Sequence, residues 1–146
     1  MKIKIKLTHK DAKIPTYAHT GEDACVDLYA AEVSGNALSS NKIVVDFGVA
    51  FEIPAGYCAL IFPRSSIHKK DLFLSNCVGV IDSGYRGNVT AVFYKDKLNF
   101  QNNKIEVGER CAQMMIIPVP TIEFEQVETL SNSTRGNGGY GSTGKI

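Results

Sequence analysis

The chain has 146 residues, 44% of them hydrophobic and 21% charged, and its net charge at pH 7 is +1. These values are typical of one globular domain, and a chain of this length buries roughly 70% of its unfolded surface without disulfides or metal ions. The charges form no basic stripe of the kind that neutralises the phosphates of a nucleic acid. We therefore expect no stable nucleic-acid binding, and any phosphate should be held by a local cluster of residues.

The pattern also argues against a membrane or a secreted protein. The segment Met1–Leu7 is charged and lacks the continuous apolar stretch of a signal peptide. No apolar run approaches the roughly 20 residues that cross a bilayer. We expect no membrane contact and a cytoplasmic location, or a nuclear one in a eukaryotic cell.

The cysteines suggest neither a disulfide framework nor a zinc site. They form no CxxC pair, and no histidine stands at a zinc-ligand spacing from them. We expect all four to be small buried hydrophobic residues in a reducing compartment. They are Cys25, Cys58, Cys77 and Cys111.

Almost all predicted elements are strands. Runs rich in β-branched and aromatic residues predict strands at Lys2–Leu7, Ile43–Ile53, Tyr57–Phe62, Leu72–Leu74, Val78–Ile81, Asn88–Tyr94, Lys104–Val107, Cys111–Pro118 and Ile122–Val127. Short turn signals rich in glycine, asparagine and aspartate separate these runs. Only Ser65–Lys70 is predicted to form a helical turn, with Ser65 as its N-cap. Many short strands favour an all-β fold, either an antiparallel sandwich or a jelly roll.

The composition changes near Thr129, which divides the chain into a β core over 1–128 and a glycine-rich tail over 129–146. The tail has too few side chains to fill a core, and glycine loses much conformational entropy on ordering. It nevertheless carries the guanidinium of Arg135, the ring of Tyr140 and the hydroxyls of Ser142 and Thr143. These groups suit a polyanion attached to a flat ring, so we expect a flexible lid that orders on a ligand.

Four further segments carry polar groups that strands and turns alone do not require. Asp27 lies in the apolar run ACVDL, where it is either a hydrogen-bonded strand residue or a metal partner. Arg64, Ser65 and Ser66 stand at the start of the helical turn, where they either bind an anion or only cap the turn. Gln113 lies in a strand, where its amide needs a partner.

The segment from Asn76 to Gly87 is denser in polar groups. An apolar strand ends in a tight turn that carries Asp82 and Tyr85, and Asn76 offers an amide. The carboxylate of Asp82 either forms an ordinary Asx turn or acts as a base beside a hairpin that binds a ring of a ligand.

In chain order the segments ACVDL, PRSS, GVIDSGYRG, GERCAQ and RGNGGYGSTG resemble the five motifs of the trimeric dUTPase family, from residue 24 to residue 144. The resemblance implies a β jelly-roll homotrimer that hydrolyses dUTP to dUMP and pyrophosphate, which limits uracil in DNA and supplies dUMP for thymidylate synthesis. It also implies that three subunits share each active site, and that the tail of one chain closes over the pocket of another.

The resemblance assigns a role to each motif residue. It implies that Asp82 is the base that activates the attacking water. Mg²⁺ would be held mainly by the triphosphate, with Asp27 contacting it through water. The implied substrate-binding residues are Arg64, Ser65, Ser66 and Gln113 for the α- and β-phosphates, Asn76, Val80 and Ile81 for uracil, Tyr85 for deoxyribose, and Arg135, Tyr140, Gly141, Ser142 and Thr143 in the lid.

Three positions depart from the family's usual motifs. Cys25 and Gly84 replace a glycine and an acidic residue, and Tyr140 stands where phenylalanine is frequent. None of these changes removes a residue assigned to chemistry. Two alternatives stay open: a dCTP deaminase-like enzyme of the same fold, and a regulatory protein whose nucleotide-closed state binds a partner protein.

Overall fold

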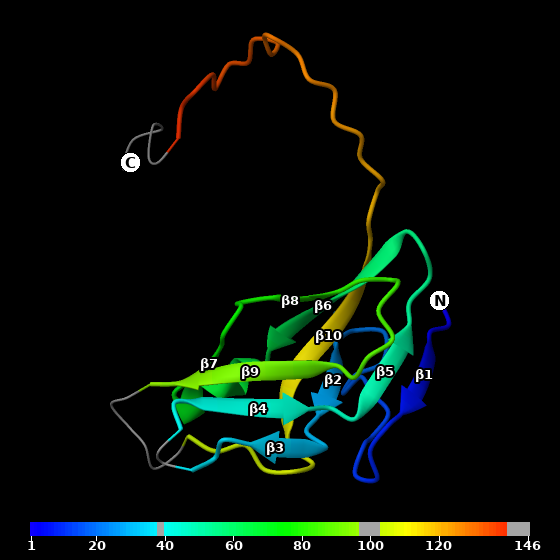
Figure 1. The fold of residues 1–146 in the computed structure, drawn as a ribbon, viewed down its shortest axis with the longest axis vertical. Helices are drawn as coiled ribbons and strands as arrows, with labels where there is room; N and C mark the ends of the chain where they lie inside the picture. The colour runs from blue at the N-terminus through cyan, green and yellow to red at the C-terminus, as the bar shows by residue number, and fades with distance from the viewer. Residues whose placement is uncertain (38–39, 97–102, 140–146) are drawn as a thin grey trace.

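The computed structural model describes residues 1–37, 40–96 and 103–139. Within these ranges the chain forms ten strands and one short 3₁₀ helix, η1 (Ser65–Lys70). The strands build a compact β body from which the carboxyl-terminal segment extends (Figure 1). The all-β jelly-roll class predicted from the sequence is confirmed.

All strand pairs in the described residues are antiparallel, and they form three sheets. The first sheet has the order β2 (Val26–Tyr29), β10 (Arg110–Pro118), β6 (Tyr57–Pro63) and β8 (Gly79–Ile81). The second has the order β3 (Glu32–Ser34), β4 (Lys42–Asp46), β9 (Thr90–Lys95) and β7 (Leu72–Leu74). The third pairs β1 (Lys4–Leu7) with β5 (Val49–Glu52).

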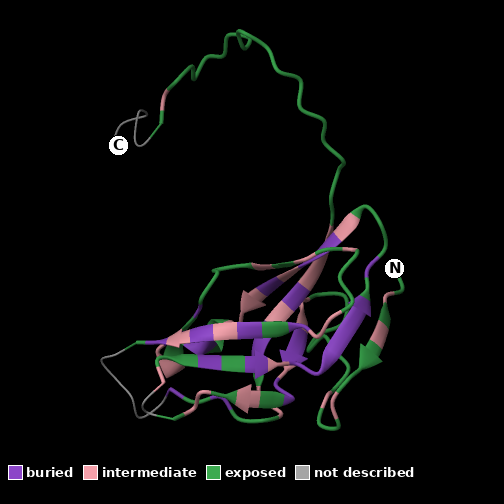
Figure 2. Ribbon diagram, viewed as in Figure 1, coloured by how far each residue is buried: buried purple, intermediate pink, exposed green. Residues whose placement is uncertain are grey.

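The hydrophobic core lies where these sheets face one another (Figure 2). Along β4, buried Ile43 and Val45 alternate with exposed Lys42 and Val44, as the period of two along a strand requires. Phe93 of β9 is fully buried and belongs to the same cluster. Burial of this apolar surface is the main force that holds the sheets together.

The predicted strand Ile43–Ile53 is in fact two strands, β4 and β5, with a bend at Phe47 and Gly48. Gly48 has a φ of +63°, a left-handed conformation that favours glycine. A Cβ at this position would lie 2.8–2.9 Å from the Cβ atoms of His9, Ala12 and Ala31. The sequence shows a continuous β-branched run, whereas the bend depends on this contact with distant residues.

Two other predicted strands are absent from the described residues. Residues 104–107 are irregular, because the backbone of Ile105 is hydrogen-bonded to the side chain of Asn36 and not to a neighbouring strand. Nδ2 of Asn36 donates to the Ile105 carbonyl at 2.8 Å, and the Ile105 amide donates to Oδ1 of Asn36 at 3.2 Å. Residues 122–127 are also irregular, and their apolar side chains are exposed. A strand in that segment would need a partner strand, and the described residues supply none.

Three smaller predictions need correction. Ser65 is not the N-cap of η1: the preceding residue, Arg64, has extended dihedral angles and makes no side-chain capping bond. The strand β3 was not predicted, because Glu32–Ser34 is short and mostly polar. Cys58 and Cys111 are buried as expected, but Cys77 is exposed and Cys25 is only partly buried.

Beyond β10 the chain leaves the body. Its first residue there, Val119, still donates its amide to the carbonyl of Gly56 at 2.7 Å. Farther along, Ile122, Phe124 and Leu130 are 67%, 89% and 87% exposed, and the segment runs away from the sheets in Figure 1. In the part of the chain that the structure describes, no helix is long and apolar enough to cross a membrane.

Candidate active site

Strand register places two of the predicted site residues in one row of the first sheet. Gln113 of β10 pairs with Asp27 of β2 on one side and with Phe62 of β6 on the other. The Gln113 amide nitrogen donates to the carbonyl of Pro63 at 3.1 Å, which supplies the partner that a glutamine inside a strand needs. Arg64 follows at the end of β6, so three of the predicted polar groups meet at this end of the sheet.

Asp27 is the electrostatic centre of this cluster. Its side chain is only 10% exposed, and its two carboxylate oxygens each contact a guanidinium. Nε of Arg64 lies 2.7 Å from Oδ1, and Nη1 of Arg110 lies 3.0 Å from Oδ2. A carboxylate this deeply buried needs such compensation, because burial of an unpaired charge is very unfavourable.

Arg110 was not among the predicted site residues. It stands at the start of β10, three positions before Gln113 in the same motif. The signal that points to it is the carboxylate within the apolar run ACVDL, which requires a positively charged partner. The sequence does not say which arginine supplies that charge, because the pairing joins residues from distant parts of the chain.

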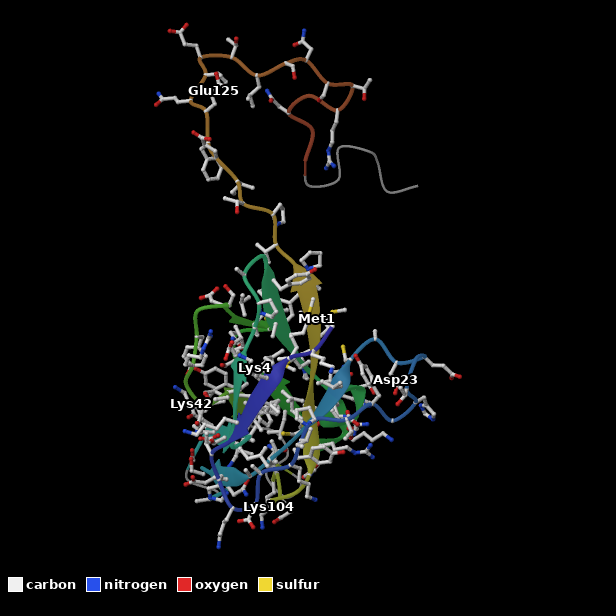
Figure 3. The ribbon with its side chains drawn as sticks, turned by 90° about the vertical axis from the view of Figure 1, so that its right-hand side faces the viewer. Met1, Lys4, Asp23, Lys42, Lys104 and Glu125 are labelled. Carbon is white, nitrogen blue, oxygen red and sulfur yellow. The ribbon has the colours of Figure 1, made fainter. Side chains whose placement is uncertain are left out.

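A cavity of about 430 Å³ opens beside this cluster. It is lined by Asp27, Arg64, Ser65 and Gln113, together with residues of the loop before β2: Ala18, His19, Asp23, Ala24 and Cys25. Figure 3 shows Asp23 projecting from that loop. The loop is held by a bond from the His19 amide to the Asp23 carboxylate at 2.6 Å, and this bond is the main reason that the pKa of Asp23 lies below its usual value. Ser66 is exposed on η1 and does not line this cavity.

The second group of predicted residues lies on the turn after β8. Asp82 is exposed, and its carbonyl accepts the amide of Tyr85 at 3.1 Å, which closes the turn. The Tyr85 hydroxyl donates to the carbonyl of Asn88 at 3.0 Å. A hollow of about 170 Å³ is lined by Val80, Ile81, Asp82, Tyr85, Asn88 and Thr90.

Asn76 joins this group through a neighbouring hollow of about 260 Å³, which Val80 and Ile81 also line. A Cβ on Gly79 would stand 3.8 Å from the Asn76 amide nitrogen and only 3.1 Å from Cβ of Ile61. Glycine at position 79 therefore lets the strand approach Ile61 closely while the amide of Asn76 lies alongside. Asp82 and Tyr85 thus line one hollow and Asn76 the other, and Val80 and Ile81 line both.

The two groups lie at opposite ends of β6. In the β6–β8 register Ile81 pairs with Ala59, so Asp82 follows at the level of Cys58, whereas Arg64 stands just beyond the other end of β6. Six residues along a strand span about 20 Å. The two sets of cavity-lining residues also have no member in common. Within one chain the Asp82 carboxylate does not reach the Arg64 cluster.

Only the first part of the predicted lid lies within the described residues. Arg135 is exposed, and its Nε donates to the carbonyl of Gly138 at 2.9 Å. Figure 3 shows the preceding segment, which carries Glu125, extending away from the body. Tyr140, Gly141, Ser142 and Thr143 lie outside the described residues.

The described residues contain no group of three histidine, cysteine or carboxylate side chains that could hold a metal ion by itself. Mg²⁺ keeps several waters and takes only one or two carboxylates together with substrate phosphates, so its binding does not require such a group. The carboxylate of Asp27, at the wall of the 430 Å³ cavity, is the kind of group that accepts hydrogen bonds from such waters. The residues present therefore fit a metal ion that arrives with a phosphate-bearing ligand.

The fold and these two clusters define a class of protein: a β jelly roll with two separate polar clusters, one around Asp27 and one on the turn after β8. The dUTPase family model matches residues 10–144. The deoxyuridine 5'-triphosphate nucleotidohydrolase of Hydrogenobaculum sp. is 38% identical over 145 residues, covering 99% of each chain. That of Escherichia phage T5 is 37% identical over 153 residues, covering 97% of this chain and 98% of its own.

The solved structures agree with the sequence comparisons. A point mutant of the dUTPase of Staphylococcus bacteriophage 80alpha, in complex with dUpNHpp, superposes with a TM-score of 0.81 at 33% identity and 98% coverage of both chains. A mutant dUTPase from phage phi11 of S. aureus, described with a structural Mg(II) ion, superposes with a TM-score of 0.71 at 26% identity, covering 88% of this chain and 98% of its own. The chain belongs to the dUTPase family.

Proposed function

We propose that this protein hydrolyses dUTP to dUMP and pyrophosphate, which limits uracil in DNA and supplies dUMP for thymidylate synthesis. The observation that carries the proposal is the turn after β8, which exposes the Asp82 carboxylate beside Tyr85 and two neighbouring hollows. The family match over residues 10–144 supports the same reaction. The dCTP deaminase alternative is not favoured, because the matching family is that of dUTPase.

In the proposed reaction Asp82 acts as the general base. Its carboxylate accepts a proton from a water whose oxygen attacks the α-phosphorus. The bond from the α-phosphorus to the oxygen bridging it to the β-phosphorus breaks, and pyrophosphate leaves with the electron pair. A positioned base of this kind typically contributes about 10²–10⁴-fold to the rate.

The hollows of about 170 and 260 Å³ beside the turn after β8 bind the nucleoside. Asn76 and the backbone at Val80 and Ile81 hydrogen-bond the uracil edge. Tyr85 packs against the deoxyribose and leaves no room for a 2′-hydroxyl. A site that pairs with a base edge rejects an analogue that leaves buried polar groups unpaired by up to about 10⁴-fold.

The cavity of about 430 Å³ beside Asp27 binds the phosphates. Arg64, Ser65 and Gln113 line or border it, and Ser66 lies one residue farther along η1. Asp27 fixes the Arg64 guanidinium through Nε, and its carboxylate would contact Mg²⁺ through water. A bound Mg²⁺ would be held mainly by the triphosphate and would offset the charge that develops on the phosphate oxygens.

The protein acts as a homotrimer in which subunits share each active site. A general base must lie within hydrogen-bonding reach of the proton that it takes. Asp82 is about 20 Å along β6 from the phosphate cluster of its own chain, so the two halves of one site come from different chains. The tail closes over the assembled site: Arg135, Ser142 and Thr143 hold the terminal phosphate, Gly141 donates its amide, and Tyr140 stacks on the base. Such a lid excludes water once the substrate is bound.

The test is product release from a panel of nucleotides. Purified protein is incubated with dUTP, UTP, dCTP or dTTP, with and without Mg²⁺, and pyrophosphate and the monophosphate are measured. We expect rapid formation of dUMP and pyrophosphate from dUTP with Mg²⁺ and far slower reaction of the other three nucleotides. Release of ammonia from dCTP, or no pyrophosphate from dUTP, would contradict the proposal.

A further inference from the structure

A chain of contacts ties the Tyr85 turn to the bend between β4 and β5, and the reaction proposed above does not use it. We propose that Gly87, Asn88 and Asp46 are positioning residues that hold the Tyr85 ring and thereby set the preference for deoxyribose over ribose. The inference rests on the proposed function, in which Tyr85 packs against the sugar. It adds the residues that determine how accurately the ring is placed.

Gly87 supplies the surface on which the ring rests. A Cβ at this position would stand 2.6 Å from Cζ and 3.1 Å from Cε2 of Tyr85, and its three nearest neighbours are all atoms of that side chain. The φ of Gly87 is not positive, so an alanine there causes no backbone strain. The side chain of an alanine would therefore displace the ring, because a tyrosine side chain rotates more readily than the backbone moves.

Asn88 anchors the same hydroxyl end of the Tyr85 side chain. Its carbonyl accepts the Tyr85 hydroxyl at 3.0 Å, and its side-chain Nδ2 donates to Oδ2 of Asp46 at 2.9 Å. The other carboxylate oxygen of Asp46 accepts the Gly48 amide at 2.6 Å. Both oxygens of Asp46 are thus used as acceptors, one from the turn and one from the bend.

Backbone bonds fix the same junction. The Val89 amide donates to the carbonyl of Val49 at 2.9 Å, and the Phe47 amide donates to the carbonyl of Val89 at 3.1 Å. Val89 is 1% exposed, so this anchor lies in the core. Tyr85 is therefore positioned by a packed sheet, although it stands on an exposed turn.

Accurate placement matters because UTP differs from dUTP by one hydroxyl. The ring rejects that oxygen only if it stays close to the sugar carbon that bears it. A displacement of about 1 Å in a site can change a rate by about 10²-fold. Loss of the Gly87 surface or of the Asn88 anchor should therefore reduce the discrimination between dUTP and UTP, while Asp82 keeps its role in the chemistry.

The first experiment compares Gly87→Ala with Gly84→Ala in the same turn, where an added Cβ meets no atom within 4 Å. The ratio of kcat/KM for dUTP to that for UTP is measured, together with the unfolding temperature. We expect Gly87→Ala to lower the ratio by about tenfold or more and Gly84→Ala to preserve it. An unchanged ratio in Gly87→Ala, or an equal loss in both variants, would overturn the proposal.

The second experiment exchanges the anchor pair. Asp46→Asn leaves only one acceptor for two donors, and Asn88→Asp sets two carboxylates against each other. The double variant restores both hydrogen bonds. The new amide nitrogen at position 46 can donate to the new carboxylate at position 88, and the amide oxygen at position 46 can still accept the Gly48 amide. We expect each single variant to lose selectivity for dUTP over UTP and the double variant to regain it. Lowered unfolding temperatures with an unchanged ratio in the singles, or a double variant no more selective than the singles, would overturn the proposal.

The parent protein separates this inference from the proposed function. A parent that does not hydrolyse dUTP would refute the proposed function, and this inference would fail with it. A parent that is selective for dUTP, with a Gly87→Ala variant equally selective, would refute this inference alone.

Discussion

Asp82 carries the most specific claim at the scale of single residues. It follows β8, and the turn that contains it closes through the bond between its carbonyl and the Tyr85 amide. The carboxylate side chain is exposed, so its replacement by the isosteric amide should not disturb the core.

We therefore expect Asp82→Asn to keep the fold and the binding of dUTP while turnover falls by about 10²–10⁴-fold. The measurements are kcat from pyrophosphate release and the dissociation constant for a non-hydrolysable dUTP analogue. Ser83→Ala serves as a control in the same turn. Parental turnover in Asp82→Asn would show that this residue only forms the turn.

The four cysteines should react with alkylating reagents in an order that the structure sets. Cys77 is exposed, whereas Cys58 and Cys111 are buried. Burial raises the pKa of the Cys111 thiol to about 12. The pKa of the Cys25 thiol is also raised, mainly by burial and to a smaller extent by the negative charge of Asp27. The reactive form is the thiolate, so a raised pKa slows the reaction.

We expect iodoacetamide at pH 8 to modify Cys77 first, Cys25 more slowly, and Cys58 and Cys111 only after unfolding. Peptide mapping by mass spectrometry gives the order. The raised pKa of Cys111 also has a consequence for stability: above pH 9 the thiol ionises in the unfolded chain but not in the fold, so stability falls as pH rises toward 12. Early modification of Cys111 in the folded protein would contradict this description of the core.

At the scale of elements, the bend between β4 and β5 positions both the core and the turn that carries Tyr85. Its conformation depends on Gly48, which combines a positive φ with three neighbouring Cβ atoms closer than 3 Å to an added Cβ. Gly56 offers a matched control, because its φ is +81° but an added Cβ meets no atom within 4 Å.

We expect Gly56→Ala to lower the free energy of unfolding by about 1–2 kcal/mol, through backbone strain alone. Gly48→Ala should cost about 1–3 kcal/mol more, because it adds overpacking to the strain. Urea unfolding of both variants measures the difference. Equal losses would mean that the crowded surroundings of Gly48 relax freely.

The carboxyl-terminal tail makes a separate prediction at this scale. Removal of all residues after Thr129 takes away Arg135, Tyr140, Ser142 and Thr143 but no residue of the hydrophobic core. The truncated protein should unfold at a similar temperature and hydrolyse dUTP far more slowly, because stacking on an aromatic ring contributes roughly 1–3 kcal/mol per base. Full activity after truncation would refute the lid.

The success of the sequence-based predictions also varies with the element. The strand Leu72–Leu74 was predicted with its observed bounds, because it is a short apolar run flanked by turn residues. The break at Gly48 and the irregular course of residues 104–107 were not predicted, because contacts with His9, Ala31 and Asn36 cause them. Local pattern cannot indicate contacts that the fold creates between distant segments.

The same distinction applies to the candidate site. Asp82, Tyr85 and Gln113 stand in motifs that can be recognised in the sequence. Arg110 and Asn88 gain their roles from Asp27 and Asp46, which lie far away in the chain. The boundary between core and tail at residue 129, and the roles of the lid residues that lie beyond the described ranges, stay predictions.

At the scale of the whole molecule, the separation of the Asp82 turn from the Arg64 cluster is the central feature. The β6 register places the Asp82 turn and the Arg64 cluster at opposite ends of one strand. The segment after β10 also carries exposed apolar side chains, with Phe124 89% and Leu130 87% exposed. Both features agree with a protein that works as an assembly.

We expect the protein to be a trimer in solution, because the proposed site needs residues from more than one chain. Light scattering coupled to size exclusion should give three times the mass of one chain. A fully active monomer would contradict both the assembly and the shared site.

The most direct test of the shared site is subunit complementation. Asp82→Asn and Arg64→Gln are first shown to be inactive separately, and are then co-expressed with different affinity tags to yield mixed assemblies. If Asp82 and Arg64 of one site come from different chains, each trimer that contains both variants has one site in three with both parental residues. We predict that the mixed protein regains about that share of parental dUTP hydrolysis. Mixed assemblies as inactive as the single variants would show that each site is built within one chain, and would contradict this account.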